Sequence, residues 1–377
     1  MQFAFFHLMP YTEVKETGRD WPVANKRFDP VVGTELYKTY IDTLAYAEDV
    51  GFDWIGCNEH HMSPFGLMAN PNLIGAALIQ RTKRAKLAIV GNLVPLLNPI
   101  RVAEEYAMLD VMSGGRLIAG ILRGIPHEYV AYNIAGDESR ARLIEATELI
   151  RKAWTEPEPF GWEGEFYQFR AVSIWPRPRQ QPHPPMLMSG SNEASARLAG
   201  ELRAKLGIVA LSDIDDTKRL IEAYHDGAAK AGWTPTEDDV LIGTLCSVAD
   251  TAEQAKAQLA AGQKFFLEVL SGGVRTAQQL VMQKTRYFDD QTRSQWGDVR
   301  KKFGVSIDIL LEKGLILCGT SAQVVDQIGT MHRRLGHGVM NVNMKIGNVP
   351  ESAVRHGMDL FGAKVIPQLR MLGKAAA

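Results

Sequence analysis

The sequence predicts a (β/α)8 barrel, in which eight parallel strands alternate with helices. Short apolar runs rich in Val, Ile, Leu and Phe recur along the chain, and stretches with helical spacing of apolar residues lie between them. Most of these runs are apolar at nearly every position, as strands buried on both faces are. An open doubly wound sheet is the alternative, and it is less favoured because no glycine-rich dinucleotide-binding turn follows the first strand.

The expected elements alternate strictly along the chain. Strands are expected over residues 3–8, 54–57, 86–94, 116–121, 185–190, 206–211, 240–248 and 338–346. Helices are expected over residues 34–51, 70–84, 98–112, 138–154, 192–202, 217–232, 251–266 and 351–369. Asn98 and Pro99 form an N-cap followed by proline at the first helical position, and Gly51 and Gly232 fall where helices should end.

Two segments exceed a minimal barrel, although residues 1–377 are expected to form one domain. Residues 157–184 predict an aromatic hairpin followed by a proline-rich connector. Residues about 270–315 are polar with scattered aromatic side chains, among them Tyr287, Phe288 and Trp296. Long insertions of this kind are usually functional, and we expect this one to cover the mouth of the barrel.

Composition excludes several classes of protein. The net charge of −1 comes from interspersed signs, without the basic stripe of a nucleic-acid-binding protein. No apolar run approaches the about 18 residues that a membrane span needs, and the first residues do not resemble a secretion signal. Cys57, Cys246 and Cys318 are too far apart for a disulfide framework, so we expect a reducing, cytoplasmic setting.

Polar residues follow the predicted strands, at the end of a barrel where active sites lie. Those residues are His7, Glu59, His60, His61, Asn92, Arg123, Ser189, Gly190, Ser191, Ser212 and Asp213. The densest group is the segment NEHHM, residues 58–62. It raises three possibilities: a metal site, an acid/base pair or a polar loop.

Three chemistries are disfavoured for this set of residues. Neighbours on an extended chain point to opposite sides, so Glu59, His60 and His61 do not converge easily on one metal ion, and no HExxH motif supports such a site. Acyl transfer would need a GxSxG turn, and phosphoryl transfer would need a Walker loop; the sequence has neither. A phosphate-bearing ligand beside an acid/base histidine remains.

The evidence for that ligand leaves alternatives open. The segment MSGSNEASARLAG places a small-residue turn between a strand and a helix, which suits an anion site, but an ordinary N-cap has the same pattern. Arg123 follows an apolar strand and either faces an anion or pairs with a carboxylate such as Glu128. His60 and His61 are either acid/base groups or satisfied hydrogen-bonding groups, and their position beside Glu59 favours the first.

Three segments of the sequence resemble the luciferase-like flavin-dependent monooxygenase family. They are FDWIGCNEHHMSPFGLMANP, NPIRVAEEYAMLDVMSGGRLIAGILRG and SRARLIEATELI. The resemblance covers nearly the whole chain, is strongest over residues 51–154, and is closest in style to bacterial luciferases and two-component oxygenases. It implies a barrel enzyme, usually a homodimer, without a metal. Such an enzyme takes reduced FMN from a separate NAD(P)H-dependent flavin reductase and reacts it with O2 through a flavin hydroperoxide.

The resemblance also assigns expected roles to residues. His60 matches the catalytic histidine, with His61 beside it in the pocket. Arg123 and Ser191 match groups on the FMN phosphate, and Gly91 and Asn92 fall near a non-proline cis peptide under the flavin ring. The full set expected to contact the cofactor is Glu59, Gly91, Asn92, Arg123, Ser189, Gly190 and Ser191. Ser212 and Trp296 are weaker matches to the flavin pocket.

Two departures from luciferases bear on the reaction. Leu122 stands where luciferases have a reactive cysteine, and Gly190 stands where they have an acidic residue, so we expect oxygenation without light emission. The substrate expected is a small or medium apolar molecule such as an aldehyde, ketone or terpenoid, in a pocket shaped by Phe65, Leu67 and Met68. The alternatives are a deazaflavin-dependent hydride-transfer enzyme and a flavin-binding subunit without turnover.

Overall fold

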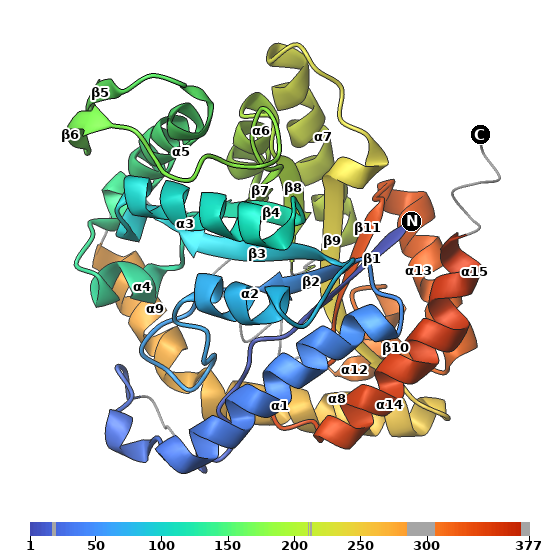
Figure 1. Ribbon diagram of the computed structural model, residues 1–377. Coiled ribbons are helices and arrows are strands. Elements are labelled where there is room, and N and C mark those ends of the chain that lie inside the picture. The colour runs from blue at the N-terminus through green and yellow to red at the C-terminus, as the bar shows by residue number, and fades with distance from the viewer. Residues whose placement is uncertain (17–19, 210, 212, 285–305, 371–377) are drawn as a thin grey trace.

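The computed structural model describes residues 1–370 except 17–19, 210, 212 and 285–305 (Figure 1). Eight parallel strands close into a barrel, with each strand paired to the next and β11 paired back to β1. The strands are β1 (Gln2–Phe6), β2 (Trp54–Cys57), β3 (Lys86–Leu93), β4 (Leu117–Leu122), β7 (Met186–Ser189), β8 (Lys205–Ile208), β9 (Val240–Val248) and β11 (Val339–Asn343). The predicted (β/α)8 barrel is confirmed.

Each expected helix is present and packs on the outside of the barrel (Figure 1). These are α1 (Pro30–Asp49), α2 (Pro71–Ile79), α3 (Pro99–Ser113), α5 (Ser139–Thr155), α6 (Glu193–Glu201), α7 (Ile214–Lys230), α8 (Ala252–Phe265) and α14 (Glu351–Leu360), the last continuing through a π-helical turn into α15 (Ile366–Arg370). Asp29, Asn70 and Asn98 cap α1, α2 and α3, and a proline follows each cap. These caps satisfy amides that a helix start would otherwise leave unbonded.

The connection from β9 to β11 holds more structure than the sequence predicted. Besides α8 it contains α9 (Gly272–Lys284), α12 (Ile307–Glu312), the short strand β10 (Leu317–Gly319) on β9, and α13 (Ser321–Leu335). Thr320 and Gln323 form a capping box at the start of α13, and Gly336 ends it in the left-handed conformation. Tyr287, Phe288 and Trp296, expected in the cover of the mouth, lie outside the described residues.

The hairpin expected within residues 157–184 is present as β5 (Phe160–Glu163) and β6 (Gln168–Val172). Glu145 of α5 holds its turn: its carboxylate accepts hydrogen bonds from Trp162 Nε1 (3.1 Å) and from the amides of Phe166 and Tyr167 (2.9 and 3.0 Å). Arg142 and Lys152 of α5 also lie over the rings of Phe166 and Phe160, so the hairpin is held on the outside of the barrel by α5.

The interior of the barrel is filled by buried side chains in its middle and is partly exposed toward the carboxyl ends of the strands. Side chains that alternate to the inside form a layer that is at most 2% exposed, made of Ala4, Trp54, Ala88, Ile118, Leu187, Leu241 and Val339. Toward the carboxyl ends of the strands, Phe6, Val90, Ser189 and Leu245 are partly exposed and Val209 is 46% exposed. Four inner positions there are glycine: Gly56, Gly120, Gly207 and Gly243. The barrel is therefore open to solvent at the carboxyl end, which we call the mouth. None of the described helices has the length and apolarity of a membrane crossing.

Candidate active site

The segment after β2 sends its side chains alternately to two sides. Beyond the end of β2 at Cys57, Glu59 and His61 bond to each other, whereas His60 between them bonds to Glu128. The two histidines therefore belong to separate networks. Among the described residues no cluster of His, Cys, Asp or Glu has the arrangement of a metal site.

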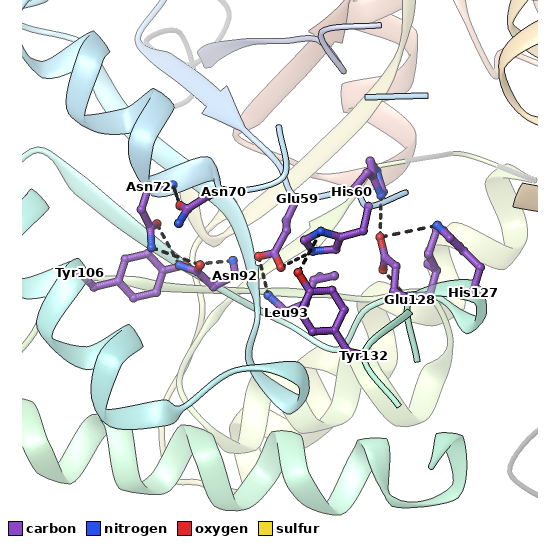
Figure 2. A network of polar contacts seen from close by, with 12 residues as sticks. Glu59, His60, Asn70, Asn72, Asn92, Leu93, Tyr106, His127, Glu128 and Tyr132 are labelled. Carbon is purple, nitrogen blue, oxygen red and sulfur yellow. Dashed lines mark hydrogen bonds and ion pairs between the residues drawn. The ribbon is translucent and has the colours of Figure 1, made fainter. Parts of the chain in front are cut away.

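His60 is held by a buried carboxylate. Its Nδ1 lies 3.0 Å from Oε1 of Glu128, which is fully buried, while the His60 side chain remains 20% exposed (Figure 2). Oε2 of Glu128 accepts the amide of Ile125 (2.8 Å). Burial alone would raise the pKa of Glu128, but the hydrogen bond from His60, the nearby His127 and the Ile125 amide lower it below its ordinary value. An ionised Glu128 accepts only, so it favours the His60 tautomer with the proton on Nδ1.

His61 and Glu59 form the second network, which ties together the ends of three elements. Glu59 Oε1 lies 2.8 Å from His61 Nε2, and its Oε2 accepts the amide of Leu93 at the end of β3 (3.1 Å). His61 Nδ1 lies 3.2 Å from the hydroxyl of Tyr132, just after α4 (Pro126–Ala131). Burial raises the pKa of Glu59, against the opposing effect of the His61 hydrogen bond. Both side chains are buried, so they support the mouth from behind.

Asn92 lies in a third network, on the outer side of β3. Its side chain exchanges hydrogen bonds with Asn72 of α2 (3.0 and 3.2 Å), and Asn72 also donates to Glu105 of α3 (2.6 Å). The pairing of β3 with β4 shifts between Ile89 and Asn92, which accounts for the outward direction of this side chain. Asn92 was expected to contact a cofactor. Its side chain points outward to α2, and only its backbone faces β4.

The backbones of β3 and β4 approach closely beside that shift. The Val90–Gly91 peptide bond is cis. A Cβ on Gly91 would lie 2.7 Å from the carbonyl oxygen of Gly120, so a side chain does not fit there. Tyr106 of α3 bridges the two strands, since its hydroxyl donates to that same oxygen (2.5 Å) and accepts the amide of Asn92 (3.2 Å). Gly91 is therefore required by packing, and it lies beside the inner residue Val90.

The expected anion-binding residues follow β4 and β7, whose pairing brings their ends together. Arg123 directly follows β4, and its charge opposes the burial that raises the pKa of Tyr129. Ser189 ends β7 and is partly exposed, Gly190 is buried, and Ser191 is exposed. A Cβ on Gly190 would lie 2.5 Å from Leu206 Cδ1, so packing also explains this glycine.

The helix after that turn begins with Asn192, whose side chain accepts both the amide and the hydroxyl of Ser195 (2.9 Å each). The N-cap interpretation of the turn is thus correct, and it is compatible with the anion interpretation because the first amides of α6 still point away from the helix. Asp213 similarly caps α7. His7 is buried against Tyr40 of α1, with ring centroids 5.2 Å apart, and so lies away from the mouth. Ser212 is outside the described residues.

Sequence reasoning missed the partners of the two histidines. Glu128 was considered only as a partner for Arg123, and Tyr132 was not considered. A signal was present: Pro126 and Glu128 stand at the first and third positions of α4, where proline and a carboxylate that bonds back to the chain are favoured. That signal predicts the short helix, but the contact of Glu128 with His60 arises only when the segments after β2 and β4, on either side of β3, come together in the barrel.

Comparisons with known proteins agree with this architecture. The family model for luciferase-like monooxygenase matches residues 22–338. The alkanal monooxygenase alpha chain of Photobacterium leiognathi is 24% identical over 89% of this chain and 94% of its own length. The oxygenase component of the flavin-dependent trigonelline monooxygenase of Acinetobacter baylyi is 28% identical over 59% of this chain. That match spans 62% of the Acinetobacter protein. An uncharacterised protein of Sinorhizobium fredii is 33% identical to this chain, and the match spans 57% of that protein.

Solved structures share the fold over nearly the whole chain. The monooxygenase RslO1 from Streptomyces bottropensis superposes with a TM-score of 0.77 at 25% identity, covering 98% of this chain and 100% of that one. The oxygenating constituent of 3,6-diketocamphane monooxygenase of Pseudomonas putida, in complex with FMN, gives 0.74 at 20% identity, covering 97% and 98%. An F420-dependent secondary alcohol dehydrogenase gives 0.67 at 17%, covering 97% and 98%. Because the family model matches most of its length, the chain belongs to the luciferase-like monooxygenase family.

Proposed function

We propose that this member of the family is an FMN-dependent monooxygenase, which uses reduced FMN and O2 to oxygenate a small or medium, largely apolar substrate. The observation that carries the proposal is the His60–Glu128 pair, which supplies a partly exposed imidazole with a fixed orientation at the open end of the barrel. A flavin-binding subunit without turnover would not need a buried carboxylate on this histidine, and we disfavour that alternative for this reason.

The residues at the mouth fit a flavin. Inner side chains above the closed layer are partly exposed, so a ligand at the mouth can reach them. A phosphate would be held by Arg123 and by the turn of Ser189, Gly190 and Ser191 with the first amides of α6. Gly91 would offer its backbone to the ring, with Glu59 and Asn92 supporting that backbone from behind. Bound reduced FMN would supply the electrons that activate O2.

His60 would manage a proton at Nε2. Since Glu128 accepts the proton on Nδ1, Nε2 is left with a lone pair and can accept a proton from, or return it to, a group at the mouth. The ring is fixed on its other side by Phe65, whose centroid lies 4.6 Å away in an edge-to-face contact. His61 would act indirectly, because its two nitrogens are occupied by Glu59 and Tyr132.

The substrate would lie against apolar side chains beside His60. Phe65 contacts Phe266 of the π-helical turn after α8 (5.1 Å between centroids), and Leu67 is partly buried against the same core, whereas Met68 is only 1% exposed and belongs to that core. Such apolar side chains exclude water from the reaction. The same fold serves an F420-dependent dehydrogenase, so deazaflavin-dependent hydride transfer is the second candidate, and oxygen consumption separates the two.

The proposal includes two protein partners. A separate NAD(P)H-dependent reductase would supply the reduced FMN, as the oxygenase component among the relatives suggests. A second copy of the chain would cover the exposed apolar side chains of Leu73 on α2 and Met108, Val111 and Met112 on α3, whose helices lie side by side in Figure 1. A cytoplasmic setting agrees with three cysteines that are all free and buried.

The test compares wild type with His60→Ala. We expect the variant to bind FMN with unchanged affinity and to consume O2, but to release most of it as hydrogen peroxide, so that product per flavin oxidised falls at least about tenfold. An unchanged product yield in a folded His60→Ala protein would overturn the role of His60.

A further inference from the structure

Asn58 has an unusual side chain for a buried residue at the mouth. It is 4% exposed, and its Oδ1 and Nδ2 have no hydrogen-bond partner among the residues that the structure describes. Oδ1 of Asn343, the last residue of β11, is in the same condition. Buried amides are costly without partners, so such groups call for an explanation.

Asn343 faces the interior of the barrel, and Asn58 follows the end of a nearby strand. On β11, Val339 belongs to the closed inner layer, so Asn341 and Asn343 alternate to the same side. Asn343 is level with Phe6 of β1, which is in turn level with Gly56 of β2, and Asn58 follows two residues beyond Gly56. Asn58 and Asn343 therefore flank Phe6 at the mouth, and His60 lies on the side of Asn58, two residues further along.

The fold does not use Asn58 as it uses other buried asparagines. The amides of Asn72 and Asn92 are also buried, and they are satisfied by each other and by Glu105. In that network, each buried amide has hydrogen-bond partners within the protein, which Asn58 lacks among the described residues. Asn58 offers a donor and an acceptor side by side, just after the carboxyl end of β2.

We propose that Asn58 recognises an amide-like edge of the substrate, in which a carbonyl accepts from Nδ2 and an adjacent N–H donates to Oδ1. The substrate class is a cyclic amide, or a nitrogen heteroaromatic in its lactam form, with its apolar remainder against Phe6 and Phe65. Asn343 Oδ1 accepts from a second donor of the same molecule. The inference rests on the proposed function because it places this edge beside His60, and it narrows the largely apolar substrate proposed there to a planar molecule with one polar edge.

Binding to the protein loaded with oxidised FMN tests this without turnover. The probes are 2-quinolone and naphthalene, which share a bicyclic shape and differ in the lactam edge, measured by equilibrium dialysis. We expect wild type to bind 2-quinolone at least about tenfold more tightly, because a site with buried polar groups rejects an analogue that leaves them unpaired. Asn58→Leu should abolish that preference while its affinity for naphthalene and FMN stays the same. Asn348→Leu, an exposed position, is the control.

Three results would overturn the inference: no preference in wild type, an unchanged preference in Asn58→Leu, or an equal loss of FMN affinity in that variant, which would assign the amide to the flavin. If Asn58→Leu does not fold, Asn58→Ala repeats the comparison, since it also removes the amide donor and acceptor. The two proposals fail separately. A preference for 2-quinolone without any oxygenation would contradict the proposed monooxygenase function. Oxygenation without that preference would contradict only the role of Asn58.

Discussion

Replacing Glu128 with glutamine tests the structural basis of His60 reactivity. The carboxylate accepts two hydrogen bonds, one at each oxygen: His60 Nδ1 at 3.0 Å and the Ile125 amide at 2.8 Å. Glutamine has the same shape but only one oxygen. If that oxygen keeps the Ile125 amide, the NH2 group faces Nδ1, which must then accept, and the proton of His60 moves to Nε2. The nitrogen that faces the mouth changes from an acceptor to a donor.

The expected magnitude follows from the loss of one charge-assisted hydrogen bond. Such bonds contribute about 1.5–3 kcal/mol, against about 1 kcal/mol for a neutral one, so the orientation of His60 loses about 0.5–2 kcal/mol. That difference corresponds to a decrease of about 2- to 30-fold in coupled oxygenation. The FMN dissociation constant should stay within about twofold, because no cofactor contact is assigned to Glu128.

Product formed per flavin oxidised measures the effect, and the nitrogen chemical shifts of the imidazole report which tautomer is present. Glu145→Gln is the matched control, because Glu145 also accepts several hydrogen bonds but holds the outer hairpin. Coupled oxygenation at the wild-type level in folded Glu128→Gln, with the tautomer changed, would refute the reasoning.

Three further predictions concern separate parts of the structure. Arg123→Leu should weaken FMN binding about 10- to 100-fold and leave riboflavin binding unchanged, since a guanidinium contact serves the phosphate alone; equal losses for both in titrations would contradict it. Gly120→Ala should destabilise the protein by about 3 kcal/mol or prevent folding, because its Cβ would lie 1.9 Å from the carbonyl oxygen of Ile89. Gly207→Ala, whose Cβ would lie 3.4 Å from its nearest neighbour, is the control, and its free energy of unfolding in thermal denaturation should fall far less. Burial lowers the pKa of His337 from 6.5 to about 3, so only the unfolded chain gains its proton as the pH falls below 6.5. Stability should therefore fall by about 1.4 kcal/mol per pH unit from this group, and His337→Gln should flatten the urea-denaturation profile by that amount; an unchanged slope would show that His337 is not the cause.

The eight barrel strands could be predicted because each is an apolar run whose composition reports burial on both faces. The helix α13 was missed although its capping box at Thr320 and its terminal glycine at 336 are plain local signals, and the reason is that strict alternation assigned one helix to each connection. The observed ends of the strands differ from the predicted ends by up to three residues. The last inner positions at the mouth are polar or small, and such residues have a weak local preference for a strand.

For the site, alternation correctly separated His60 from His61, since that rule depends only on the extended backbone. The outward direction of the Asn92 side chain could not be predicted by this rule, because the register shift in β3 reverses it. The contact of Glu128 with His60 joins residues 68 positions apart, and no local pattern contains it. Long-range contacts of this kind need the closed barrel.

Oxygen reactivity of the reduced flavin on this protein tests the central claim most directly. The purified chain is mixed with anaerobically reduced FMN and then rapidly with oxygenated buffer, while absorbance is recorded. The proposed function predicts a transient spectrum, distinct from reduced and oxidised flavin, that outlives free reduced FMN and shortens in His60→Ala. Simple oxidation at the rate of free flavin would contradict the monooxygenase and favour deazaflavin-dependent hydride transfer.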